Sequence, residues 1–151
     1  MKPFAVFRVA GLMVALASAG CISYVEDVPA SVAEVDFGGS QGHTGWARYE
    51  RTSLLRNTRL ADALRGGEKA LAAHDFALRK SDLAAAVVVG EHGETSWDRN
   101  IIAAIYFRQE GEDVRVRIHV QASRGVGFFG HQADPDWTAY LDAALRGILQ
   151  R

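Results

Sequence analysis

The sequence predicts an α+β fold, a two-layer sandwich in which two helices cover one face of an antiparallel sheet of about four strands. Residues 114–121 alternate apolar and polar side chains, which is typical of a strand. Residues 137–149 repeat apolar side chains every three or four positions, which is typical of an amphipathic helix. Further candidate strands follow one another through short turns. The expected order is therefore strand, helix, three strands, helix.

The first strand and the first helix are expected between residues 46 and 75. Residues 46–52 alternate, with Trp46, Arg48, Glu50 and Thr52 on one side, and predict a strand at an edge of the sheet. Asn57 or Thr58 offers an N-cap for a helix that ends near Asp75. One face of this helix carries Leu60, Leu64, Gly67 and Leu71. The pair Gly66-Gly67 predicts either close packing on the sheet or a kink.

The candidate strands that follow differ in pattern. Residues 76–80 form a short candidate, and residues 84–89 form an unbroken apolar run that fits a central strand. Residues 100–109 carry Ile101, Ala103, Ile105 and Phe107 on one face. After a turn at residues 110–113, Val114, Val116, Ile118 and Val120 alternate with Arg115, Arg117, His119 and Gln121. This last alternation predicts one buried face and one solvent-exposed face.

The last helix has a clear start signal. Asp134, Pro135 and Asp136 supply an N-cap, a proline at the first helical position and an acid that the helix dipole favours. The apolar stripe then runs through Trp137, Tyr140, Leu141, Ala144, Leu145, Ile148 and Leu149. The helix is expected to cover the sheet.

Length and composition exclude several classes of protein. The 151 residues suit one domain, and 48% hydrophobic with 23% charged residues excludes a disordered chain and a polytopic membrane protein. The formal charge of −1 argues against a nucleic-acid partner, which needs clustered excess lysine and arginine. A single cysteine excludes an internal disulfide.

The N-terminus has the layout of a signal peptide. Lys2 and Arg8 precede the uncharged eleven-residue stretch 9–19, which is too short to span a bilayer, and small residues lead to Cys21. This arrangement resembles the bacterial lipoprotein signal, in which a small residue and glycine precede the cysteine that is lipidated. It departs from that pattern at Ser18, where leucine is usual. A conventional signal peptide with an incidental cysteine is the alternative.

The lipoprotein resemblance implies an exported protein that is anchored through lipid on Cys21. Ile22 replaces the aspartate that commonly retains such proteins at the inner membrane, so the expected location is the periplasmic face of the outer membrane. Without residues 1–20 the chain has 15 basic and 18 acidic residues, a formal charge of −3. Residues 22–45 are rich in glycine and carry no lasting periodicity, so they are expected to form a flexible tether from Cys21 to a domain at residues 46–151.

The order of elements over residues 46–149 resembles small βαβββα lipoprotein domains. These include the helix-grip domains of BamC and several uncharacterised lipoprotein families. The resemblance implies the fold and the location more than the function, since one fold hosts many functions.

Two features are candidate contacts for an envelope partner. Residues 125–130 match G-x-G-x-x-G, but the expected helix begins well after the last glycine, so a dinucleotide site is not expected. Phe128 and Phe129 on this loop would instead dock a partner if they are exposed. Arg115, Arg117 and His119 form a basic stripe that would contact an acidic partner, lipid headgroups or a cell-wall polymer.

The sequence predicts no catalytic residue, cofactor or metal. His131, Asp134 and Asp136 are the best metal candidate, but both aspartates already have a capping role. We therefore expect a lipid-anchored envelope protein that acts as a non-catalytic binding or structural module. The alternative is a small-ligand-binding protein or hydrolase that uses a cavity between the helices and the sheet.

Overall fold

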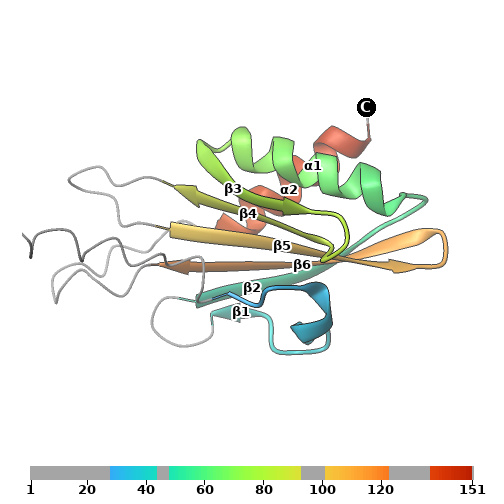
Figure 1. Cartoon of the computed structure of the whole chain (residues 1–151), viewed down its shortest axis with the longest axis horizontal. Helices are drawn as coiled ribbons and strands as arrows, with labels where there is room; N and C mark the ends of the chain where they lie inside the picture. Colours follow the sequence, from blue (N-terminus) through green and yellow to red (C-terminus); the bar gives the residue numbers. More distant parts are fainter. Residues whose placement is uncertain (1–27, 44–47, 93–100, 123–136, 151) are drawn as a thin grey trace, which may run out of the picture.

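Two helices pack on one face of an antiparallel sheet (Figure 1). The computed structural model describes residues 28–43, 48–92, 101–122 and 137–150. The helices are α1 (Leu60–Ala72) and α2 (Trp137–Leu149), and a 3-10 turn, η2, covers Val32–Glu34. The strands are β1 (Gly42–His43), β2 (Arg48–Leu55), β3 (Phe76–Asp82), β4 (Val87–His92), β5 (Ile101–Glu110) and β6 (Asp113–Ala122).

The sheet is wider than expected. Its spatial order is β1-β2-β6-β5-β4-β3, with every neighbouring pair antiparallel. The α+β class, with two helices on an antiparallel sheet, is confirmed, while the sheet has six strands instead of about four and the order of elements differs from βαβββα. Four strands follow α1 rather than three, because the short candidate at residues 76–80 is a full strand. β2 also lies beside the two-residue β1, so it is not the outermost strand.

The start of helix α1 differs from the expectation. Its N-cap residue is Arg59 rather than Asn57 or Thr58. The first helical amide, that of Leu60, donates to Oε1 of Gln109, 2.9 Å away on β5. A side chain distant in sequence thus satisfies a group that a local cap usually satisfies.

The core between the helices and the sheet is apolar and closely packed. It joins buried side chains of both helices to the alternating apolar residues of β5 and β6, including Leu71, Phe107, Val116, Ile118, Leu141 and Leu145. Gly66 and Gly67 lie inside a continuous α1, so they allow close packing and do not break the helix. A Cβ on Gly67 would lie 2.8 Å from Cζ of Phe107, and one on Gly66 would lie 2.9 Å from Cδ1 of Leu145.

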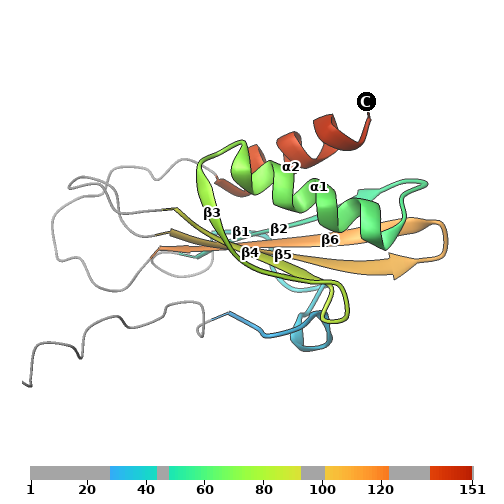
Figure 2. The same cartoon turned by 45° about the horizontal axis from the view of Figure 1, so that its top comes forward.

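The second face of the sheet is also covered. Residues 28–41, which we call the strap, cross this face on the side away from the helices (Figure 2). Val28 and Phe37 are buried there against the second apolar set of the sheet, which comprises Val87, Val89, Ile102, Ala104 and Tyr106. The strap then continues into β1, where Gly42 and His43 pair with Glu50 and Tyr49.

The expected tether over residues 22–45 is therefore wrong for residues 28–43. They belong to the folded domain because β4 and β5 are apolar on both faces and need cover on both. Cys21 and residues 22–27 lie outside the described residues. Among the described helices, none is long and apolar enough to cross a membrane.

Replacing Gly67 with alanine is expected to lower the free energy of unfolding. Overpacking against Phe107 costs ~1–3 kcal/mol, and the better helix propensity of alanine returns ~1 kcal/mol. We expect a net loss of up to about 2 kcal/mol in urea unfolding. The matched control is Gly147→Ala in α2, where a Cβ meets nothing within 4 Å, and it should gain stability. A Gly67→Ala variant as stable as Gly147→Ala would contradict the close contact.

Candidate functional site

A hollow of about 420 Å³ lies on the strap-covered face of the sheet. Hydrogen bonds fix the path of the strap around it. The carbonyl of Pro29 accepts from the Tyr106 hydroxyl at 2.8 Å, the amide of Val32 donates to Ala85, and the carbonyl of Ser40 accepts from Arg117. The strap thus leaves from above β5, turns near the β3–β4 connection and returns over β6. It encloses the hollow as a U-shaped rim.

Three rows of cross-strand neighbours lie beneath the strap, and five of their residues line the hollow as its floor, namely Arg48, Glu50, Tyr106, Arg117 and His119. The sheet register pairs Thr52 with Arg117 and Arg117 with Tyr106. The next row is Glu50, His119 and Ala104, and the third is Arg48, Gln121 and Ile102. Because alternate residues of a strand share a face, all three rows point toward the strap.

Arg117 joins the floor to the strap. Its side chain is buried, with the residue 2% exposed, and its guanidinium donates to four oxygens. Nη2 lies 2.7 Å from Glu50 Oε2 and 2.7 Å from the Ser40 carbonyl, while Nη1 lies 2.8 Å from Thr52 Oγ1 and 3.4 Å from the Gly39 carbonyl. A buried charge needs such partners to offset its lost hydration. Arg117 therefore holds the strap against β2 and β6.

Glu50 connects Arg117 to His119. Its Oε1 lies 3.1 Å from His119 Nδ1, and Oε2 takes the bond from Arg117. Burial lowers the pKa of His119 below its ordinary value, although hydrogen bonds to Glu50 and Gln121 oppose that shift. The imidazole is thus neutral at neutral pH. Because a carboxylate only accepts, Nδ1 carries the hydrogen in its bond to Glu50.

The third row lies at the other end of the hollow from Thr52. Gln121 Oε1 lies 3.4 Å from both His119 Nε2 and Arg48 Nη2. Arg48 is an exposed residue, so its cation faces solvent at this end.

The rim at the turn of the U is acidic. Glu34 and Asp36 line the hollow there. Burial raises the pKa of the Tyr106 hydroxyl, and the nearby charge of Glu34 raises it further. Asp36 lies near Arg117, because a Cβ on Gly39 would be 3.2 Å from Asp36 Oδ2 and 3.4 Å from Arg117 Nη2.

The basic stripe of Arg115, Arg117 and His119 was expected to face solvent, but two of its three side chains are buried. Arg117 and His119 are 2% and 6% exposed and lie beneath the strap, so they are not open to a macromolecular partner. Arg115 is more open, with 37% of its side chain exposed, and pairs with Glu110 at 2.8 Å. Hydrogen bonds from Arg115 and Arg108 lower the pKa of Glu110 to about 2. The alternation of β6 located these residues on one face but did not reveal the strap.

Several other predicted residues fall outside the part of the chain that the structure describes. Cys21, Phe128 and Phe129, as well as the candidate metal residues His131, Asp134 and Asp136, lie outside the described residues. Within the described ranges, no group of three histidine, cysteine, aspartate or glutamate side chains is arranged to hold a metal ion.

Sequence reasoning missed the partners of Arg117. Glu50 and Thr52 share a face of the first expected strand, and that alternation is the signal that could have found them. Gly39 and Ser40 contribute only backbone carbonyls, which leave no mark in the pattern of side chains. Tyr106 lies on the second face of β5, whose apolar neighbours Ile102 and Ala104 do signal a covered surface.

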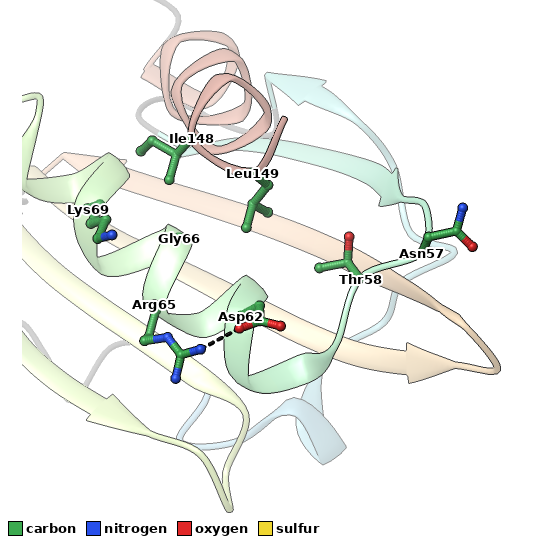
Figure 3. A pocket seen from close by; sticks show the side chains of 8 residues that line it. All are labelled: Asn57, Thr58, Asp62, Arg65, Gly66, Lys69, Ile148 and Leu149. Carbon is green, nitrogen blue, oxygen red and sulfur yellow. Dashed lines mark hydrogen bonds and ion pairs between the residues drawn. The ribbon is translucent and has the colours of Figure 1, made fainter. Parts of the chain in front are cut away.

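A second hollow, of about 300 Å³, lies at the helices (Figure 3). Its lining joins Ile148 and Leu149 of α2 to Gly66 and Lys69 of α1. Arg65 is exposed and pairs with Asp62 one turn away. This groove combines an apolar side with surface charges, whereas the strap hollow has buried charges fixed by several bonds each. The strap hollow is therefore the stronger candidate site.

Comparisons with known proteins identify no family. No family model matches the chain, and no curated protein matches it. Among solved structures, TTHA0849 from Thermus thermophilus is similar at 15% identity and a TM-score of 0.32, over 69% of this chain and 91% of that chain. Similarity at this level carries no argument about function.

Replacing Arg117 with glutamine is expected to loosen the strap. The change leaves Glu50 and the carbonyls of Gly39 and Ser40 without their shared donor, at a cost of ~3–5 kcal/mol in unfolding free energy. Hydrogen exchange of residues 28–41 should rise. The control is Arg115→Gln on the same strand and face, which should leave exchange in the strap unchanged because that pair is exposed. Equal hydrogen exchange of the strap in both variants would contradict the role of Arg117 in holding the strap.

The lowered pKa of His119 predicts a pH dependence of stability. As pH falls below the ordinary value of 6.5, the unfolded chain takes up a proton before the folded one does. The stability contributed by neutral His119 is therefore present above that pH and is lost as pH falls through the folded pKa. Urea unfolding should show a smaller loss from pH 7.5 to 5.5 for His119→Gln than for the wild type. The two proteins should behave alike between pH 7.5 and 8.5, and equal losses at acid pH would overturn this assignment.

Proposed function

We propose that this chain is a lipid-anchored envelope protein whose folded domain acts as a non-catalytic binding module. The strap hollow supports this role. Its floor is held by the bonds among Arg117, Glu50 and His119, so the shape of the hollow is fixed before a ligand arrives. A preorganised polar floor favours binding, because less side-chain freedom is lost when a ligand is held.

The non-catalytic part of the proposal follows from how the polar groups are engaged. Glu50 accepts from both Arg117 and His119, and its side chain is 19% exposed. Both carboxylate oxygens of Glu50 are therefore already engaged by neighbouring side chains. Structural anchoring of the strap accounts for these contacts without a reaction.

The alternative of a hydrolase or ligand-binding protein placed its cavity between the helices and the sheet. In the described part of the chain, that space holds the side chains of the main apolar core. The hollow lies on the opposite face. Ligand binding is therefore retained in the proposal at a different place, and a hydrolase finds no support from the described residues.

The anchor is proposed at Cys21, on the periplasmic face of the outer membrane, and it rests on the resemblance of residues 1–21 to lipoprotein signals. Phe128 and Phe129 remain a proposed contact for an envelope partner. Likeness to the helix-grip lipoprotein domains stays a prediction.

The anchor is tested by replacing Cys21 with serine in the full chain expressed in bacteria. The variant should lose palmitate label and leave the membrane fraction, because the chain has no other cysteine to acylate. Ser18→Leu, which restores the usual residue of the lipobox, is the control and should keep both label and membrane association. A Cys21→Ser protein that still carries palmitate label would contradict lipidation at Cys21.

A further inference from the structure

We propose that the strap hollow binds a short zwitterionic peptide of about three residues, with its carboxylate at Arg48 and its ammonium group at Glu34 and Asp36. This inference rests on the proposed binding function and names the ligand class of that site. Three properties of the hollow lead to it, namely the position of its charges, the distance between them and the way its central charges are neutralised.

The positive end of the hollow is Arg48. Its Nη2 donates to a neutral acceptor, Gln121 Oε1, at 3.4 Å, which is long for a guanidinium. The residue is exposed and lines the hollow. A guanidinium in this position offers a carboxylate two parallel N–H donors.

The negative end is formed by Glu34 and Asp36, which the strap carries at the turn of the U. Their hydrogen bonds come from local backbone amides and from one hydroxyl. Asp36 Oδ1 accepts from the amide of Gly38 at 2.8 Å, and Glu34 accepts from Ala30 and Ser31. Each carboxylate retains further acceptor capacity for a cationic ammonium group.

The charges between the two ends are already balanced. Arg117 and Glu50 form a pair at 2.7 Å, and burial keeps His119 neutral. The floor between the ends therefore presents fixed polar groups and the ring of Tyr106 without a net charge. A ligand that fits carries opposite charges at its two ends and little charge between them.

The spacing sets the length of the ligand. Arg48 lies in the third row of the floor, while Glu34 and Asp36 approach the first row, which contains Tyr106 and Arg117. The two rows lie four steps apart along β2, which is about 13 Å along the strand at ~3.3 Å per residue. An extended peptide covers ~3.3–3.6 Å per residue, so three residues and their end groups span this distance. The 420 Å³ of the hollow lies within the ordinary range for small-ligand sites.

Calorimetric titration of the detergent-solubilised full chain tests the inference, with trialanine as the probe. Trialanine should bind saturably. N-acetyl-trialanine, which lacks the ammonium group, and trialanine amide, which lacks the carboxylate, should each bind about tenfold more weakly, because each has lost one charged contact. Phosphatidylethanolamine vesicles, which present a zwitterionic headgroup, test whether the hollow binds a lipid instead of a peptide.

Two variants assign the ends. Arg48→Gln should weaken the binding of trialanine by about tenfold and leave the weak binding of trialanine amide unchanged. The double variant Glu34→Gln with Asp36→Asn should weaken the binding of trialanine by about tenfold and leave the weak binding of N-acetyl-trialanine unchanged. Arg65→Gln at the helices is the control and should leave the affinity unchanged. Absence of trialanine binding, equal binding of all three probes, or binding to the vesicles alone would each overturn the inference.

Failure of this inference is distinguishable from failure of the proposed anchor. Palmitate labelling that persists without trialanine binding rejects the ligand alone. Trialanine binding by a chain that takes up no label rejects the anchor and keeps the ligand.

Discussion

The sheet needs cover on both faces, and the rest of the structure depends on that constraint. β5 has seven consecutive buried residues, Ile101 to Phe107, so neither side of this strand can face water without a large loss of hydrophobic free energy. The amphipathic helices supply one cover. The strap supplies the other, although it brings only a few apolar side chains, among them Val28 and Phe37.

A cover with so little apolar area needs polar attachment, and Arg117 provides it. The guanidinium is isolated from water by the strap, and the strap is held by the guanidinium through the carbonyls of Gly39 and Ser40. Each stabilises the other, because a buried cation without these partners would be strongly destabilising. The same arrangement leaves a hollow between strap and sheet, so the candidate site is a consequence of how the second face is covered.

This coupling explains which features the sequence predicts and which it does not. Periodicity locates β6 and α2 well, because Val114, Val116 and Ile118 alternate and Leu141 and Leu145 repeat at helical spacing, and all five are fully buried. The alternation in β6 misleads on its polar side, where a charged residue normally indicates solvent. Arg117 can be buried because two backbone carbonyls of the strap and two side chains of β2 accept its hydrogen bonds. Ala104 and Tyr106, apolar on the supposedly exposed face, were the available sign that something covers it.

Inclusion of the strap in the fold also changes the geometry of the proposed anchor. Six residues separate Cys21 from Val28, which limits their reach to roughly 25 Å at ~3.6 Å per residue. A tether of the expected 24 residues would have let the domain turn freely above the membrane. Under the proposed lipidation, the chain enters the domain on the strap face, opposite the helices (Figure 2). Under that proposal the strap face, which holds the hollow, is the face from which the chain runs toward the anchor, and the helices with their groove lie on the opposite face of the sheet.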